Sequence, residues 1–215
     1  MIVPVEEAAR LLSKGGVVAY PTETVFGLGA DALDRGALER LLELKGRDPA
    51  RGLSVLVPDL CALERWLPEL PEPARLLAKR YWPGPLTLVL PVADEFLSAV
   101  ATDFGVGFRC SSHPVAAELA RRARNPIVST SCNRSGEEPC GTAREVQERF
   151  GEDLPVVAGP AGGPVPSTVV AIRPDGDLRC LREGAIPFEE LRACARAEGS
   201  SPGSRPETKS WVTGA

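Results

Sequence analysis

Residues 15–29 read GGVVAYPTETVFGLG, and this stretch decides what kind of fold the chain can adopt. The apolar run at 17–20 is typical of a buried strand that ends at Pro21. No amphipathic helix follows it directly. Two threonines, Thr22 and Thr24, follow instead with a glutamate, an apolar pair and two glycines, and we expect a glycine-punctuated loop there. Hydroxyls at the end of an apolar strand need a structural or functional explanation.

The rest of the chain alternates apolar runs with helical patterns, which predicts an α/β domain. We expect further strands at 53–58, 86–91, 106–110, 126–130, 155–159, 167–173 and 178–182, and helices at 5–14, 34–45, 59–67, 72–81, 114–124, 142–150 and 187–197. No helix separates the strands at 86–91 and 106–110, nor the last three strands. A wholly parallel sheet needs such crossovers, so we expect a mixed sheet.

The length and composition fit one globular domain, because the 215 residues are 43% hydrophobic and 25% charged. We expect this domain to span residues 1–197. The Ser-, Pro- and Gly-rich residues 198–215 are expected to form a disordered tail. The formal net charge of −4 argues against a protein built to coat nucleic acid, although local basic clusters could still hold a phosphate.

The six cysteines show no metal-binding spacing. None belongs to a C-x-x-C pair, and the chain has only one histidine. The N-terminal residues lack the pattern of a secretory signal, and no apolar run is long enough to cross a membrane. We therefore expect a cytoplasmic protein with free thiols, no membrane association and no protein-held metal ion.

A cationic cluster follows the predicted helix at 34–45. The segment LKGRDPARGL (44–53) brings Lys45, Arg47 and Arg51 close together. Lysine is rare in this chain, and its flexible ammonium suits a phosphate oxygen. The alternative is a favourable charge at a helix C-terminus, which would contribute little to stability.

Polar side chains also follow the predicted strand at 126–130. Ser129, Ser131 and Asn133 lie in PIVSTSCNRSG (126–136), where hydroxyls and a carboxamide suit a polar, hydrogen-bonded ligand. Ligands of α/β sheets bind at strand ends, which favours this interpretation. Side chains of these types can equally bond nearby backbone groups in a turn.

Arg109 lies within an apolar predicted strand, where an unpaired charge is costly. It therefore needs a carboxylate of the protein or an anionic ligand. His113 precedes a predicted helix and is more typical of a capping residue than of a catalytic base. The loop at 159–166 leads into the next strand through Ser167 and Thr168, and it is either a connector or a flap over the same pocket.

Several common nucleotide-binding and hydrolytic motifs are missing. There is no GxxxxGK[ST] phosphate loop, no GxGxxG after a strand and no GxSxG elbow between a predicted strand and a predicted helix. What remains is a cationic, hydroxyl-rich pocket at the ends of several strands, which suits a nucleotide and a small polar acid. It favours phosphoryl or nucleotidyl transfer by positioning and charge stabilisation.

These stretches, in this order, resemble the YrdC-like threonylcarbamoyl-AMP synthase family over most of the chain. The segments that carry the resemblance are YPTETVFGLG (20–29), LKGRDPARGL (44–53), WPGPLTLVLP (82–91), VGFRCSSHP (106–114), VSTSCNRSG (128–136), STVV (167–170) and LREGAI (181–186). Cys132 stands where the family usually has alanine. The extra C-terminal domain of longer members has no counterpart, so we expect the short, single-domain type.

The resemblance implies a twisted, mixed sheet flanked by helices, with a large, concave, positively charged cavity. It implies that L-threonine, bicarbonate and ATP, the last accompanied by Mg²⁺, give L-threonylcarbamoyladenylate and pyrophosphate. A separate threonylcarbamoyl transferase complex would then modify tRNA. Weak binding of tRNA or other RNA is compatible with the family.

The resemblance also implies a site, residue by residue. The catalytic pair would be Lys45 and Arg47, which would bind the phosphates of ATP. The nucleotide would also be contacted by Ser131, Asn133 and Arg182. The threonine or its carbamate would be held by Thr22, Arg109, Ser129, Ser167 and Thr168.

The opening stretch then becomes one wall of the pocket. Thr22 would present its hydroxyl to the amino acid, and Thr24 would be a structural hydroxyl. Gly27 and Gly29 would let the backbone turn away without a side-chain clash.

Two rival functions stay open. One is a paralogue that forms a carbamoyl adenylate, as in hydrogenase maturation proteins, although the other regions of those longer chains are absent from this sequence. The other is a YciO-like RNA-binding protein without synthase activity, which would use the same cavity for an RNA backbone. The acidic overall charge and the K-x-R and S-T-S-x-N patterns argue against the RNA-binding alternative.

Overall fold

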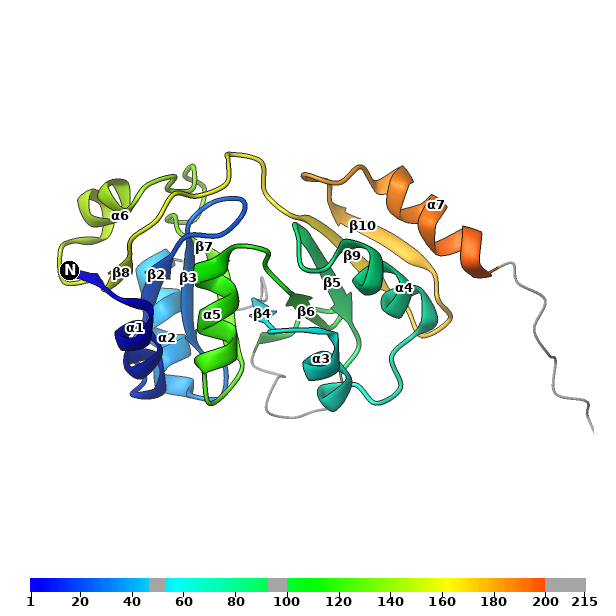
Figure 1. Ribbon diagram of the computed structural model, residues 1–215, viewed down its shortest axis with the longest axis horizontal. Helices are drawn as coiled ribbons and strands as arrows, with labels where there is room; N and C mark the ends of the chain where they lie inside the picture. The colour runs from blue at the N-terminus through cyan, green and yellow to red at the C-terminus, as the bar shows by residue number, and fades with distance from the viewer. Residues whose placement is uncertain (47–52, 93–99, 200–215) are drawn as a thin grey trace, which may run out of the picture.

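The computed structural model describes residues 1–46, 53–92 and 100–199 (Figure 1). Its strands are β1 (Ile2–Val3), β2 (Val18–Tyr20), β3 (Gly27–Asp31), β4 (Ser54–Leu56), β5 (Leu86–Leu90), β6 (Val106–Arg109), β7 (Ile127–Ser131), β8 (Val156–Val157), β9 (Thr168–Ile172) and β10 (Leu178–Arg182). Its helices are α1 (Val5–Ser13), α2 (Arg35–Lys45), α3 (Leu60–Trp66), α4 (Glu72–Tyr81), α5 (Pro114–Arg122), α6 (Ala143–Phe150) and α7 (Phe188–Gly199).

The strands form one sheet in the order β1-β8-β2-β3-β7-β4-β6-β5-β9-β10. Strand pairs such as β4–β6 and β5–β9 are parallel, whereas β3 pairs antiparallel with both of its neighbours. The expected mixed sheet in an α/β domain is therefore confirmed. No described helix is both long and apolar enough to span a membrane.

Capping residues explain why the helix boundaries could be predicted. The side chain of Asp34 accepts a hydrogen bond from the amide of Ala37 at 3.0 Å, which starts α2, and Gly46 ends it in the left-handed conformation with φ of 55°. His113 Nδ1 accepts from the amide of Val115 at 3.2 Å at the start of α5. The interpretation of His113 as a capping residue is confirmed.

The prediction of a loop after Pro21 is only partly correct. The second half of the opening stretch forms β3, which lies between β2 and β7 and pairs with both. Gly27 and Gly29 do not turn the chain away. They belong to the strand, and their missing side chains leave room for the ring of Tyr20. The short strand β1 at the sheet edge was also missed.

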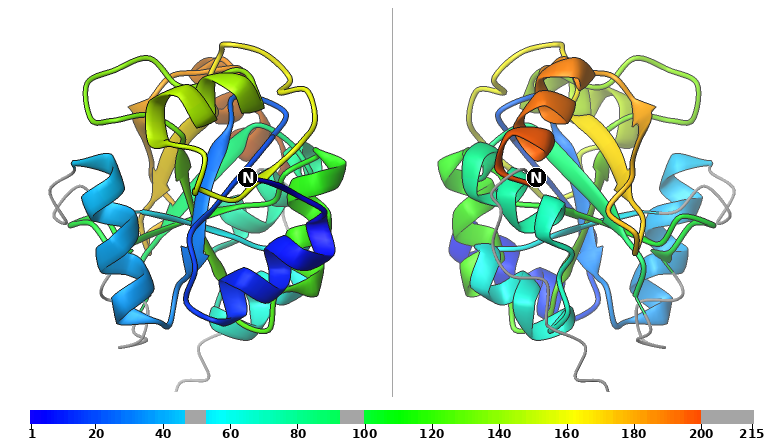
Figure 2. Two further views of the ribbon diagram at one scale, coloured as in Figure 1. Left: turned by 90° about the vertical axis from the view of Figure 1, so that its left-hand side faces the viewer. Right: turned by 90° about the vertical axis from the view of Figure 1, so that its right-hand side faces the viewer.

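Helices cover both faces of the sheet (Figure 2). On one face, α1 and α5 contact each other and pack on Val18, Tyr20 and Ile127. Alternate strand residues such as Ala19 and Leu28 belong to the larger core, to which α2, α3, α4, α6 and α7 contribute. This alternation follows from the two-residue period of a strand.

The segment between β8 and β9 crosses over the top of the molecule from one half of the sheet to the other (Figure 1). The amides of Gly162 and Gly163 donate to the carbonyls of Thr22 and Thr24 at 3.0 and 2.8 Å. The loop at 159–166 thus lies against the Thr22–Thr24 segment.

Helix α7 runs to residue 199, so it extends into the start of the predicted tail, and residues 200–215 lie outside the described residues.

Candidate functional site

A cavity of about 480 Å³ opens where the central strands meet the Thr22–Thr24 segment. It is lined by residues of β3, β4, β5, β6, β7, β9 and β10. The sheet register assembles it, because Ser129 of β7 lies opposite both Gly29 and Ser54, and Arg109 of β6 lies opposite Thr87. Side chains that are far apart in the sequence therefore face one volume.

The structure brings most of the predicted residues to this cavity. Seven of them line it, namely Thr22, Arg109, Ser129, Ser131, Asn133, Ser167 and Arg182. Lys45 and Thr168 are not in the lining, although both lie directly behind it. Arg47 lies outside the described residues.

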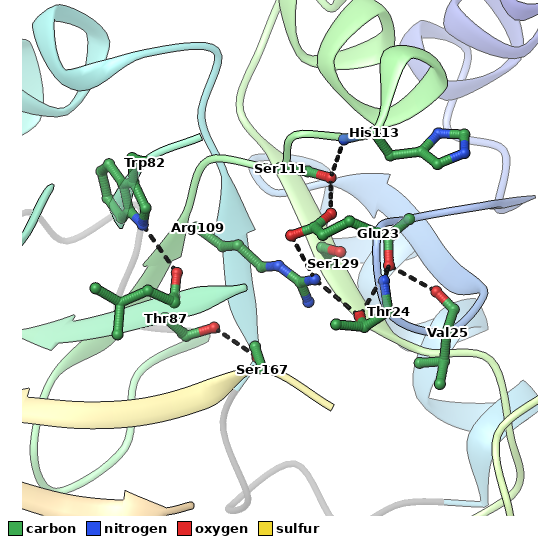
Figure 3. A network of polar contacts seen from close by, with 12 residues as sticks. Glu23, Thr24, Val25, Trp82, Thr87, Arg109, Ser111, His113, Ser129 and Ser167 are labelled. Carbon is green, nitrogen blue, oxygen red and sulfur yellow. Dashed lines mark hydrogen bonds and ion pairs between the residues drawn. The ribbon is translucent and has the colours of Figure 1, made fainter. Parts of the chain in front are cut away.

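Arg109 is held by two side chains of the opening stretch (Figure 3). Its Nη2 donates to Glu23 Oε1 at 2.9 Å and to Thr24 Oγ1 at 2.9 Å. Ser111 donates to the other carboxylate oxygen of Glu23. Arg109 Nε is buried and has no hydrogen-bond partner in the described part of the chain. The arginine therefore has both the internal carboxylate that the sequence called for and a buried donor whose hydrogen-bonding capacity is not used there.

The two threonines of the opening stretch support this arginine. Thr22 Oγ1 donates to the carbonyl of Val25 at 2.7 Å and lies 3.0 Å from Thr24 Oγ1. The amide of Thr24 donates to Thr22 Oγ1 at 3.2 Å. Thr24 Oγ1 accepts from Arg109, so the interpretation of Thr24 as a structural hydroxyl agrees with its contacts.

Tyr20 connects Ser129 to the core. Its phenolic hydroxyl donates to Ser129 Oγ at 2.7 Å. Burial raises the pKa of Tyr20 to about 12, while the hydrogen bond with Ser129 acts in the opposite direction. Tyr20 therefore stays protonated at neutral pH and remains a donor.

Lys45 is buried, so it is not simply an exposed charge at the C-terminus of a helix, which was the alternative interpretation. Its side chain is only 2% exposed. The ammonium donates to the carbonyls of Ser131 and Asn133 at 2.5 and 3.0 Å, and to Asn133 Oδ1 at 3.2 Å. A buried ammonium needs such acceptors. Lys45 consequently supports the turn whose hydroxyl and carboxamide face the cavity.

The opposite wall of the cavity is built around Ser167. Arg182 Nη2 donates to its carbonyl and hydroxyl oxygens at 2.9 and 3.1 Å, and Thr87 Oγ1 lies 3.1 Å from Ser167 Oγ. Thr168 is fully buried, and its hydroxyl donates to the carbonyl of Ile186 at 2.6 Å. It also accepts from the amides of residues 184 and 186, so its hydrogen-bonding capacity is used within the protein.

Sequence reasoning missed three contributors to the site. Glu23 and Tyr20 each form a hydrogen bond with a lining residue, and Ser111 donates to Glu23. The need of Arg109 for a carboxylate was the available signal for Glu23, but no local pattern indicated which carboxylate it would be.

Among the described residues, no group of three or more His, Cys, Asp or Glu could hold a metal ion.

Residues 10–184 match the Sua5/YciO/YrdC family, which is described as "Telomere recombination". The chain belongs to this family. It is 41% identical over 183 residues to the threonylcarbamoyl-AMP synthase of Alkalilimnicola ehrlichii, with 85% of this chain and 93% of the relative covered. It is 39% identical over 179 residues to that of Chromohalobacter salexigens, with 81% and 96% covered. The resemblance drawn from the sequence is confirmed.

Solved structures of the Sua5/YciO/YrdC family share the fold. Pyrococcus abyssi Sua5 complexed with L-threonine has a TM-score of 0.79 and 35% identity, covering 90% of this chain and 60% of the other. Escherichia coli YciO has a TM-score of 0.76 and 26% identity, covering 87% and 92%. Sua5 and YciO therefore share this fold, so the fold alone does not identify the activity. The residues of the site have to distinguish the candidate activities.

Proposed function

We propose that the protein is a threonylcarbamoyl-AMP synthase, which forms threonylcarbamoyl-AMP and pyrophosphate from L-threonine, bicarbonate and ATP. The observation that carries the proposal is the buried Nε of Arg109, which has no partner among the residues that the structure describes. A buried donor of this kind costs free energy unless a ligand accepts from it, and a carboxylate is the ligand that an arginine binds best. The synthases named above support this assignment.

The amino acid binds on the Arg109 side of the cavity. Its carboxylate accepts from Arg109, and Ser129 and Ser167 also line the cavity, on opposite walls. Thr22 shapes this wall with its backbone and methyl group, since its hydroxyl is occupied by Val25 and Thr24. The L-threonine complex of P. abyssi Sua5 supports an amino-acid site in this fold.

ATP binds between the turn that carries Ser131 and Asn133 and the opposite wall that carries Arg182. Lys45 lies under the same turn, and together with Arg47 it neutralises the phosphates. Arg109 and Arg182 are the only charged side chains in the described part of the lining, which contains no carboxylate. This composition supports a positively charged cavity. Mg²⁺ supplies further charge neutralisation and arrives with ATP, as part of the substrate.

The reaction needs positioning more than proton transfer. The amine of threonine and bicarbonate form a carbamate with loss of one water molecule. A carbamate oxygen then attacks the α-phosphate, and pyrophosphate leaves. Both reactants are anionic, so the arginines and Lys45 reduce their repulsion and hold them in line. The product then passes in the cytoplasm to a transferase complex that modifies tRNA.

The test is pyrophosphate release from ATP and bicarbonate with different co-substrates. We expect release with L-threonine, much less with L-serine and none with carbamoyl phosphate. Release that depends on carbamoyl phosphate would instead indicate the carbamoyl-adenylate paralogue. No turnover together with tight binding of tRNA or a generic RNA would indicate the RNA-binding alternative. In either case the synthase proposal is wrong.

A further inference from the structure

Counting hydroxyl hydrogens separates the residues that can donate to a ligand from those that cannot. A threonine or serine hydroxyl has one hydrogen to give. Thr22 gives its hydrogen to the carbonyl of Val25, so the hydrogen between Thr22 and Thr24 must come from Thr24. Both threonines line the cavity, yet neither has a hydrogen left for a bound molecule.

Ser129 differs from these two threonines. Its Oγ accepts from Tyr20, and no described residue accepts the hydrogen of Ser129 itself. The residue lines the cavity and is 7% exposed. Its hydroxyl is therefore a donor that the protein orients but does not use.

The direction of the Tyr20–Ser129 hydrogen bond follows from burial. Tyr20 is fully buried, and Ser129 is the partner of its hydroxyl. If Ser129 donated instead, the phenolic hydrogen would be buried without an acceptor, which is the costly case for a polar group. Because burial also raises the pKa of Tyr20 to about 12, this hydrogen stays in place over the whole working pH range.

The glycines of β3 make the contact possible. Tyr20 on β2 reaches across β3 to Ser129 on β7, and its ring lies over Gly27 and Gly29. A Cβ on Gly29 would come within 2.8 Å of the ring, and one on Gly27 within 3.2 Å. The two glycines share a face because strand residues alternate. The pattern G-x-G here therefore makes room for a tyrosine.

We propose that Tyr20 is a positioning residue that fixes the Ser129 hydroxyl as a donor toward the cavity, where it selects a carboxylate oxygen of the amino-acid substrate. This inference rests on the proposed threonine site. Arg109 Nε is a second donor without a partner in the same cavity wall. The Ser129 hydroxyl and Arg109 Nε are both donors, and the neighbouring threonines have no hydrogen to donate. We therefore expect the site to bind an anionic acceptor, such as the carboxylate of L-threonine, more tightly than the alcohol group of L-threoninol.

The test is a double-mutant cycle on Tyr20→Phe and Ser129→Ala, with L-threonine and ATP binding measured by calorimetry. We expect Tyr20→Phe to weaken threonine binding about threefold to tenfold, the usual effect of one hydrogen bond, and to leave ATP binding unchanged. The double variant should bind threonine as Ser129→Ala does, because Tyr20 acts only through Ser129. The discrimination between L-threonine and L-threoninol should shrink in Tyr20→Phe.

The unfolding temperature is a second readout, which reports the Tyr20–Ser129 hydrogen bond independently of threonine binding. Ser129→Ala leaves the Tyr20 hydroxyl without an acceptor and should lower the unfolding temperature, whereas adding Tyr20→Phe should raise it again. In the double variant, the affinity for threonine should therefore stay as low as in Ser129→Ala, whereas the unfolding temperature should rise. The matched control is Tyr81→Phe, because Tyr81 donates to Glu190 far from the cavity, and its threonine affinity should equal that of the wild type.

Two results would overturn the positioning role. One is threonine binding by Tyr20→Phe that equals the wild type. The other is an effect of Tyr20→Phe that persists in the Ser129→Ala background. If the wild-type protein itself bound no L-threonine and released no pyrophosphate with it, the proposed function would fail and this inference with it. The wild-type measurement therefore separates the two failures.

Discussion

Arg109 Nη2 donates to Glu23 Oε1 at 2.9 Å, and the two side chains are only 12% and 13% exposed. The protein thus neutralises the cavity arginine with a carboxylate of its own. The pair uses Nη2 and leaves Nε without a partner. In the proposed site, binding of the threonine carboxylate and stability of the fold would therefore depend on different nitrogens of the same guanidinium, which would make the two roles separable by substitution.

Arg109→Lys should reduce threonine binding while the protein stays folded. Lysine keeps a positive charge beside Glu23 but removes the Nε donor and the planar guanidinium. We expect the dissociation constant of L-threonine to rise at least about tenfold, with little change for ATP. Calorimetry measures both. Arg121→Lys on the surface of α5 is the control, and equal threonine affinity in the two variants would rule out the Arg109 site.

Lys45→Met should destabilise the protein and not only inactivate it. The substitution leaves the carbonyls of Ser131 and Asn133 without their charged donor. We expect the free energy of unfolding in urea to fall by about 2–4 kcal/mol, from the loss of hydrogen bonds to a buried charge. Lys79→Met on the exposed face of α4 should change it by less than about 0.5 kcal/mol. Equal stability of the two variants would refute a structural role of the Lys45 ammonium.

Gly29→Ala in β3 should be far more harmful than Gly36→Ala in α2. Its Cβ would lie 2.8 Å from the Tyr20 ring and 3.0 Å from Ile127. We expect a loss of about 1–3 kcal/mol from overpacking. The Cβ of Gly36→Ala, in α2, would lie 3.3 Å from the end of the flexible Arg40 side chain and 3.4 Å from Asp34 Oδ1, and we expect a gain of about 0.5–1 kcal/mol of helix stability. Thermal unfolding compares the two, and a tolerated Gly29→Ala would exclude the close ring packing.

Stability should fall at alkaline pH because of Tyr20. Its pKa is about 12 in the folded protein and 10.0 in the unfolded chain. Above pH 10 the unfolded chain loses this proton while the folded protein keeps it, so stability is full below pH 10 and decreases up to about pH 12. The decrease is on the order of 3 kcal/mol.

Tyr20→Phe removes this contribution and supplies the comparison. Its urea unfolding curve should depend less on pH between 10 and 12 than that of the wild type. Burial also raises the pKa of Tyr81 to about 12, but that hydroxyl is exposed, so solvent should reduce the effect of Tyr81→Phe. An unchanged pH dependence in Tyr20→Phe would contradict the assignment.

The cysteines should differ sharply in their reactivity toward iodoacetamide. Cys61 is exposed and should react first. Cys110 is buried, and burial raises its pKa to about 11. The hydrogen bond with Cys140 and burial both raise the pKa of Cys132. Because the thiolate is the reactive form, these buried thiols should stay unmodified in the native protein. Peptide mass spectrometry checks this, and labelling of Cys132 at the rate of Cys61 would contradict it.

Local sequence patterns were sufficient to predict those elements whose boundaries are set by residues next to them in the chain. The side chain of Asp34 and the conformation of Gly46 bound α2 within the chain itself, and His113 caps α5 in the same way. Such signals act over a few residues, so they can be read from the sequence. The strand β3 could not, because its glycines carry no strand preference of their own and its partners lie elsewhere in the sheet.

The sequence by itself determined the helices, most of the strands, the mixed sheet, the family and the need of Arg109 for an anionic partner. Only the tertiary structure decided that this partner is Glu23, that Lys45 is buried beneath a cavity wall, and that Ser129 rather than Thr22 has a hydrogen to donate. The reason is physical. Helix caps and hydrophobic periods depend on neighbours in the chain, whereas burial and the allocation of each hydroxyl hydrogen depend on groups that only folding brings together.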